Sequence, residues 1–246
     1  MQERFAGWGG DAGQARLAAA MVVVVGVGAL GGTSAQLLAR AGVGRLRLVD
    51  PDRPSLQNLH RQMLYNEADA AAGLPKVQAA ARCLAGVNSE VGVEAIEAAL
   101  TPDNARQLLV GADLVLDGLD NPQGRWALNQ ACWELGIPWV HAGLAGAAGQ
   151  LLVVRPGRGP CLACWTNRPG RGEASFAGAA SHGVIGPLPA CLGSLQAAEA
   201  LKLLLGAEGA LLRGMLLVEL WPPRFRVVHF DDSLRRSCPV CGGGPA

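Results

Sequence analysis

The fold is decided by Met21-Val-Val-Val-Val25-Gly26-Val-Gly28-Ala-Leu-Gly31, a valine-rich run that leads directly into a glycine loop. A run of β-branched residues is typical of a parallel strand that is covered on both faces. The glycines have GxGxxG spacing, which lets backbone amides and the next helix N-terminus approach a pyrophosphate. Asp50 ends the next predicted strand, where a carboxylate would bind ribose hydroxyls. The stretch predicts a nucleotide-binding α/β fold, although a nicotinamide-dependent dehydrogenase has the same signature.

Strand and helix patterns alternate outward from this stretch. Strands are predicted at 21–25, 46–49, 91–96, 113–116 and 138–141, and helices at 11–20, 30–41 and 75–87 and after Thr101 and Asn121. A strand at 150–154, an apolar helix at 187–205 and a hairpin of strands at 216–220 and 225–228 follow. That helix carries a polar stripe at Gln196, Glu199 and Lys202. The alternation predicts a doubly wound, Rossmann-like, mostly parallel sheet with a C-terminal β extension.

The composition limits the classes of protein to which the chain can belong. The chain has 246 residues, half of them hydrophobic, and a net charge of +1, which gives no reason to expect a nucleic-acid or membrane partner. No signal peptide is visible, and no apolar stretch is long and uninterrupted enough for a membrane span. We therefore expect one cytoplasmic domain over 1–246, with a nucleotide-binding part at 1–155 and a zinc-bound part at 156–246.

Two cysteine pairs, Cys161/Cys164 and Cys238/Cys241, have the CxxC spacing that lets two thiolates point at one metal. Together they predict a closed, structural zinc site that clamps the extension and a mobile loop at 167–183. Redox-active dithiols are the less favoured alternative. The three remaining cysteines lie in apolar helical contexts and are predicted to be buried free thiols in a reducing compartment; they are Cys83, Cys132 and Cys191.

Charged residues after the second strand favour adenylate chemistry over hydride transfer. Arg61 and Lys76 would neutralise a triphosphate, which an enzyme that expels pyrophosphate requires and a dehydrogenase does not. Asp120 follows a strand at the ligand-facing edge of such a sheet, where a carboxylate would hold Mg²⁺. Alternatively, the two cations are solvated surface charges and Asp120 caps a helix.

Several segments together resemble the ThiF/MoeB/HesA family, bacterial relatives of ubiquitin-activating enzymes, from about residue 10 to residue 241. The matching stretches are Gly26–Gly32, Ala41–Asp50, Asn58–Gln62, Pro75-Lys76, Asp117–Asn121, Gly186-Pro187, Gly193–Gln196 and both CxxC pairs. Such enzymes use ATP to adenylate the C-terminal Gly-Gly carboxylate of a small ubiquitin-like sulfur-carrier protein, in molybdopterin or thiamine biosynthesis, and are typically homodimers.

The resemblance implies a role for each matching residue. Gly26, Gly28 and Gly31 would line the ATP site, and Asp50, with Asp52 beside it, would lie at the ribose. Asn58, Arg61, Gln62 and Lys76 would contact the phosphates, with Arg61 and Lys76 stabilising the transition state. Asp120 would bind Mg²⁺ beside Asn121 and Arg125, and the four paired cysteines would bind Zn²⁺. The segment 167–183 would be the crossover loop associated with the carrier's tail.

Two departures from the family pattern leave other functions open. The position that matches a crossover-loop cysteine is Ala179, so sulfur delivery would fall to another protein. The N-terminus offers only Arg4 for the arginine that reaches the partner subunit's ATP. A relative that activates a small-molecule or tRNA carboxylate, and a non-catalytic ATP-binding relative, are the alternatives; the net charge disfavours tRNA.

Overall fold

An eight-stranded sheet forms the centre of the computed structural model, which describes residues 2–166, 183–229, 232–236 and 238–242. The strand order is β3-β2-β1-β4-β5-β6-β7-β8. The strands are β1 Met21–Val25, β2 Arg45–Val49, β3 Gly92–Ile96, β4 Leu114–Asp117, β5 Trp139–Ala145, β6 Ala148–Val154, β7 Met215–Leu220 and β8 Pro223–Val228. Strands β1 to β5 pair in parallel, and β6 to β8 continue the sheet antiparallel. The predicted fold class is therefore confirmed.

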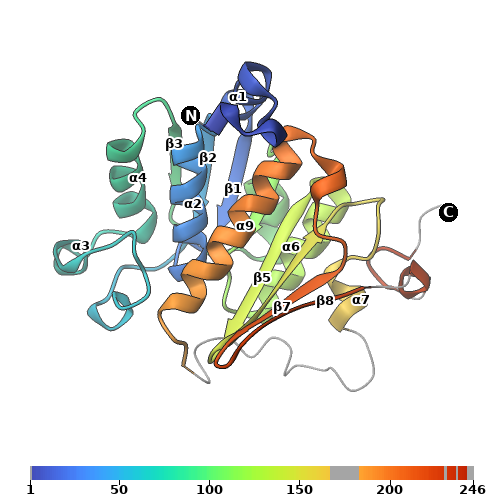
Figure 1. The fold of residues 1–246 in the computed structure, drawn as a ribbon. Coiled ribbons are helices and arrows are strands. Elements are labelled where there is room, and N and C mark those ends of the chain that lie inside the picture. The colour runs from blue at the N-terminus through green and yellow to red at the C-terminus, as the bar shows by residue number, and fades with distance from the viewer. Residues whose placement is uncertain (1, 167–182, 230–231, 237, 243–246) are drawn as a thin grey trace.

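Helices cover both faces of the parallel part (Figure 1). Val22 and Val24 of β1 point into the core beneath α2 and α9, whereas Val23 and Val25 point into the core beneath α5 and α6. This period of two explains why β1 is apolar at every position. The helices are α1 Gly10–Ala19, α2 Ala29–Ala41, α3 Glu67–Ala72, α4 Lys76–Val87, α5 Pro102–Leu109, α6 Pro122–Leu135, α7 Leu162–Thr166 and α9 Pro187–Leu205.

Helix α9 is long and apolar enough to cross a membrane by composition. It instead packs on α2, β5 and β6, and two residues of its polar stripe are buried. Gln196 Nε2 donates to the carbonyls of Asp117 and Val140, both at 2.9 Å, and Glu199 accepts from the amide of Leu212. The stripe therefore ties this core helix to the sheet and to the following loop.

The hydrophobic periodicity of the sequence did not predict the short helices. Helix α3 begins at a reciprocal capping box, in which Asn66 and Asp69 each accept the other's backbone amide proton. Cys132 is buried as predicted, whereas Cys83 and Cys191 are half-buried because they flank the buried stripes of α4 and α9. The predicted mobile loop up to residue 182, Ala179 within it, and the C-terminal residues after 242 lie outside the described residues.

Candidate functional site

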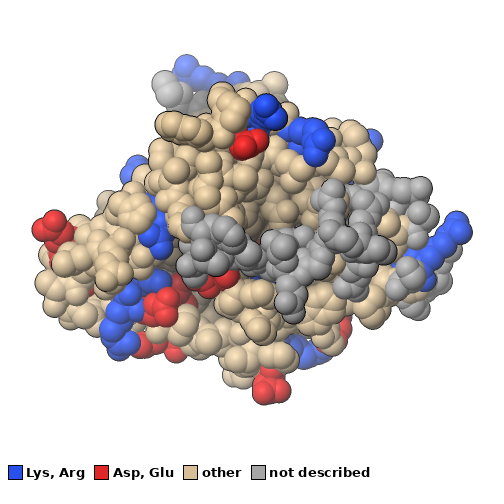
Figure 2. Space-filling view, turned by 90° about the horizontal axis from the view of Figure 1, so that it is seen from below, with Lys and Arg blue, Asp and Glu red and all other residues tan. Residues whose placement is uncertain are grey.

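A cavity of about 410 Å³ opens at the carboxyl ends of β1, β2 and β4. Chain order reverses between β1 and β4, which is the switch point where open α/β sheets bind ligands. Figure 2 views this end of the molecule, where basic and acidic side chains lie next to one another. Ten of the predicted site residues line the cavity: Gly26, Gly28, Asp50, Asp52, Arg61, Gln62, Lys76, Asp120, Asn121 and Arg125.

Glycine occupies each of the three positions of the motif for a different structural reason. Gly26 has φ +84°, and a Cβ there would lie 2.5 Å from the carbonyl oxygen of Gly118. A Cβ at Gly31 would lie 1.9 Å from the carbonyl oxygen of Gly26, so this glycine serves close helix–strand packing and does not line the cavity. Gly28 faces the cavity, and its nearest neighbour would be Gln62 Nε2 at 3.6 Å. Gly28 is thus the position where a ligand can approach the backbone.

Asp50 and Tyr65 fix the loop between these glycines. Asp50 Oδ2 accepts from the amide of Val27 at 2.7 Å, and the hydroxyl of Tyr65 donates to the Val27 carbonyl at 2.6 Å. Asp50 Oδ1 also accepts from the amide of Asp52. Each carboxylate oxygen keeps a lone pair for a further donor, so Asp50 can hold the loop and still accept from a hydroxyl in the cavity.

Lys76 is the buried cation of the site. Its side chain is 7% exposed, and Nζ lies 2.8 Å from Asp52 Oδ2 and 3.8 Å from Asp50 Oδ1. Burial raises the pKa of Asp50, and the ammonium of Lys76 opposes that rise. Arg61 lines the same cavity, and His60 Nε2 accepts from its Nη1 at 3.3 Å. The cavity therefore presents one buried and one partly exposed cation to an anionic ligand.

Asp120 and Asn121 follow β4 at the cavity wall. Asn121 Oδ1 accepts from the amide of Gly124 at 2.7 Å, so Asn121 is the residue that caps α6, and the Asp120 carboxylate is exposed to the cavity. Gln62 also lines the cavity, and its Oε1 is buried and has no hydrogen-bond partner among the described residues. A carboxylate together with an unpaired amide oxygen is a donor set that fits Mg²⁺ and its bound waters.

Two predicted contacts lie elsewhere. Asn58 ends the short helix Leu56–Asn58, where its carbonyl accepts from the amides of Arg61 and Gln62, and it does not line the cavity. Arg4 ends the short helix Gln2–Arg4, which contacts α1; α1 leads into the amino end of β1, whereas the cavity lies at the carboxyl end of that strand. Arg4 is therefore remote from the cavity of its own chain.

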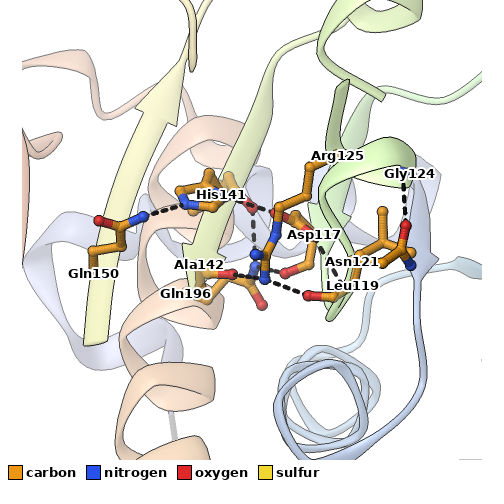
Figure 3. A network of polar contacts seen from close by, with 10 residues as sticks. Asp117, Leu119, Asn121, Gly124, Arg125, His141, Ala142, Gln150 and Gln196 are labelled. Carbon is orange, nitrogen blue, oxygen red and sulfur yellow. Dashed lines mark hydrogen bonds and ion pairs between the residues drawn. The ribbon is translucent and has the colours of Figure 1, made fainter. Parts of the chain in front are cut away.

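Sequence reasoning missed the buried polar network beside the cavity, which Figure 3 shows. The Asp117 carboxylate is fully buried at the end of β4; its Oδ2 accepts from Arg125 Nε at 3.2 Å and from His141 Nδ1 at 2.7 Å. Arg125 Nη2 donates to the carbonyls of Leu119 and Ala142. The network thus fixes the loop that carries Asp120. Asp117 and Arg125 lie in the motif that supplied Asp120, and their eight-residue spacing across a strand–helix turn was the available signal.

His141 is neutral in this network. Burial lowers its pKa, an effect that the hydrogen bond to Asp117 only partly offsets. Its Nδ1 donates to Asp117, and its Nε2 accepts from Gln150 Nε2 at 3.1 Å. Since Gln150 is on β6, the network reaches from the cavity at the carboxyl ends of β1, β2 and β4 to the antiparallel strands.

The four paired cysteines form a single buried cluster. Their Sγ atoms all lie within 4.8 Å of one another, and Cys161 Sγ is 3.9 Å from Cys164 Sγ and 3.6 Å from Cys238 Sγ. Tetrahedral Zn–S bonds of about 2.3 Å place sulfurs about 3.8 Å apart, so the cluster fits this ion. The hydrogen bond with Cys164 lowers the pKa of the Cys161 thiol to about 5. One common cluster favours a metal site over two separate dithiols.

Cys238→Ser is expected to reduce bound zinc from about one ion per chain to a small fraction, because three thiolates no longer close the tetrahedron. The thermal midpoint should fall as well, since the cluster joins α7 to the C-terminal segment within one core. Zinc is measured by atomic emission, with Cys191→Ser as the matched control outside the cluster. Full zinc content in Cys238→Ser would contradict this assignment.

Comparison with known proteins gives one family for nearly the whole chain. The profile of the ThiF family matches residues 1–240. The chain is 42% identical over 241 residues to the sulfur carrier protein adenylyltransferase of Thermus thermophilus, covering 96% of this chain and 87% of that protein. It is 36% identical over 234 residues to the sulfur carrier protein ThiS adenylyltransferase of Bacillus subtilis, covering 95% and 68%. The structure of Escherichia coli MccB with MccA-N7isoASN superimposes with a TM-score of 0.81 at 24% identity, over 94% of this chain and 69% of that one, which is a likeness of fold.

Proposed function

Since the chain belongs to the ThiF family, we propose that it is an ATP-dependent adenylyltransferase. Its substrate is the C-terminal Gly-Gly carboxylate of a small ubiquitin-like sulfur carrier, and pyrophosphate is the leaving group. The observation that carries the proposal is the convergence of Gly28, Lys76, Arg61 and Asp120 on one cavity. The relatives named as sulfur carrier and ThiS adenylyltransferases support it, and they point to sulfur-containing cofactors of the thiamine or molybdopterin type.

The chemistry follows from the charges in the cavity. A C-terminal carboxylate is already ionised at neutral pH, so its attack on the α-phosphate needs no general base. Negative charge then develops on the departing pyrophosphate, and Lys76 and Arg61 stabilise it because both line the cavity. The backbone at Gly28 admits the phosphates, and Asp50 accepts from the ribose.

Asp120, with Gln62 Oε1 nearby in the cavity wall, would hold Mg²⁺. When bound, Mg²⁺ would supply positive charge that offsets the charge of the phosphate groups. The four-cysteine cluster would hold Zn²⁺ in a structural role, because four thiolates leave no open position for a substrate.

A cytoplasmic homodimer completes the proposal. Arg4 is remote from the cavity of its own chain, so any role for it in catalysis is in the partner's cavity. A nicotinamide-dependent dehydrogenase accounts for fewer of the cavity residues, because hydride transfer does not require the positive charges of Lys76 and Arg61.

ATP–pyrophosphate exchange tests this proposal. The protein is assayed with Mg²⁺ and sulfur carriers that end in Gly-Gly, each beside a form that lacks the terminal glycine. We expect exchange with one intact carrier and none with its truncated form, and about a hundredfold slower exchange in Asp120→Asn. Exchange that occurs without any carrier would instead favour a small-molecule or tRNA carboxylate as the substrate. The absence of exchange with every carrier, while ATP still binds, would favour the same substrates or a non-catalytic relative.

A further inference from the structure

The antiparallel strands carry a cross-strand row that ends in an unpaired arginine. On the sheet face that carries His141, the register places one residue from each strand side by side, in the order Gly143, Gln150, Leu217 and Arg226. Arg226 is exposed on the edge strand β8 and has no ion-pair partner among the residues that the structure describes. Its cross-strand neighbour Leu217 is apolar, so the guanidinium is free to bind a ligand.

A second row runs parallel to the first and has a different end. It consists of Ala145, Ala148, Glu219 and Arg224. Here the arginine lies opposite a carboxylate in the cross-strand register, although no ion pair joins the two side chains in the described structure. The two rows therefore place on β8 one arginine opposite a carboxylate and one opposite an apolar residue.

Both rows line one hollow of about 570 Å³. Helix α9 packs on the opposite face of these strands, where a Cβ on Gly149 would lie 2.2 Å from Leu192 Cδ1. Arg125 and Leu144 line this hollow and also the nucleotide cavity, so the two adjoin. The hollow thus leads from the edge of the sheet to the place where the acyl-adenylate would form.

The floor of the hollow fits the main chain of a peptide. Gly143, Ala145 and Ala148 leave room for a backbone, because their side chains are hydrogen or methyl groups. The side-chain Nε2 of Gln150 donates to His141 Nε2. The side-chain oxygen Oε1 of Gln150 has no hydrogen bond among the described residues, so it can accept from a peptide amide. A small-residue floor with one free acceptor favours an extended chain without bulky side chains near its end.

We propose that the hollow seats the extended C-terminal segment of the carrier, and that Arg226 selects an acidic side chain on that segment. The proposal rests on the proposed function, because the reacting carboxylate must end in the nucleotide cavity. Three strand spacings of about 4.8 Å separate β8 from β5, or about 14 Å, and an extended chain covers about 3.4 Å per residue. The acidic residue is therefore expected about four or five residues before the terminal glycine.

Direct peptide binding tests the inference. The probes are fluorescein-labelled decapeptides that end in Gly-Gly, are otherwise alanine and serine, and carry a single glutamate at successive positions. Matched peptides carry glutamine or lysine in place of the glutamate. Fluorescence anisotropy should show about five- to tenfold tighter binding of the peptide with glutamate four or five residues before its end than of the matched glutamine peptide. Arg226→Gln should abolish that preference, and Arg226→Glu should transfer it to the matched lysine peptide.

Arg224→Gln is the matched control, since it removes an exposed arginine from the same strand that lies opposite a carboxylate, Glu219, in the register. We expect it to change the preference far less than Arg226→Gln does. Equal affinity for the glutamate and glutamine peptides, an equal effect of both arginine variants, or no binding of any peptide would overturn the proposal.

The exchange assay separates the two levels of the argument. Carrier-dependent exchange without any glutamate preference rejects the acidic-residue inference and leaves the adenylation proposal standing. A glutamate preference that needs Arg226, without exchange on any carrier, supports the peptide-binding hollow and rejects adenylation of a carrier.

Discussion

Lys76→Met is expected to slow ATP–pyrophosphate exchange by about 10²–10³-fold, the usual cost of removing one preorganised donor to a developing negative charge. Lys76 is almost fully buried, so its ammonium acts in a low dielectric and its charge is screened little by solvent. Methionine keeps most of the apolar stem but removes the charge. ATP affinity, measured by calorimetry, should change much less than the exchange rate if the cation acts chiefly in the transition state.

The chain contains two lysines, which provides a matched control. Lys202 pairs with Glu199 on α9 and does not line the nucleotide cavity, so Lys202→Met should leave the exchange rate close to that of the unaltered protein. Lys76→Arg keeps the charge and should recover part of the activity. Unchanged exchange in Lys76→Met would show that the ammonium only balances Asp50 and Asp52.

The parallel part of the fold was predictable because its signals are local. The valine run of β1, the glycines after it and the prolines at the starts of α5 and α6 each reveal an element from a few neighbouring residues. Helix α3 was missed because six residues are too few for a helical period, and its capping box is the stronger signal. The full length of β5 was missed because its last residues, Gly143 to Ala145, have little strand propensity and are held by pairing with β6.

The position of a residue at the cavity was predictable where it follows directly from its place after a strand, as with Asp50 and Asp120. Long-range contacts were not predictable in this way. His141 and Gln150 have the pattern of ordinary strand residues. The contact of His141 with Asp117, and that of Gln150 with His141, depend on how β4, β5 and β6 pair. The row that ends at Arg226 likewise depends on the register of two hairpins, which the sequence specifies only through turn geometry and burial.

Asp117→Ala should lower the free energy of unfolding by about 3–5 kcal/mol, because it leaves the buried guanidinium of Arg125 without its carboxylate. For a chain of this size, that corresponds to a fall in the thermal midpoint of roughly 6–20 °C. The substitution also removes the acceptor of His141 Nδ1 and of the Leu119 amide, so two buried donors and one partly buried donor lose this partner at once. Thermal unfolding by circular dichroism measures the loss, and Glu90→Gln, at an exposed site, should change little.

A double variant decides whether the pairing itself causes the loss. Arg125→Met removes the buried charge that Asp117→Ala leaves without a partner. The double variant should therefore lose clearly less unfolding free energy than the sum of the two single losses. Additive losses would show instead that the cavity and the lost backbone acceptors dominate. Exchange activity should remain low in the double variant even where stability recovers, because Arg125 also binds the carbonyls of Leu119 and Ala142 that frame Asp120. Recovery of both together would mean that the network supports the fold alone and does not position the proposed magnesium ligand.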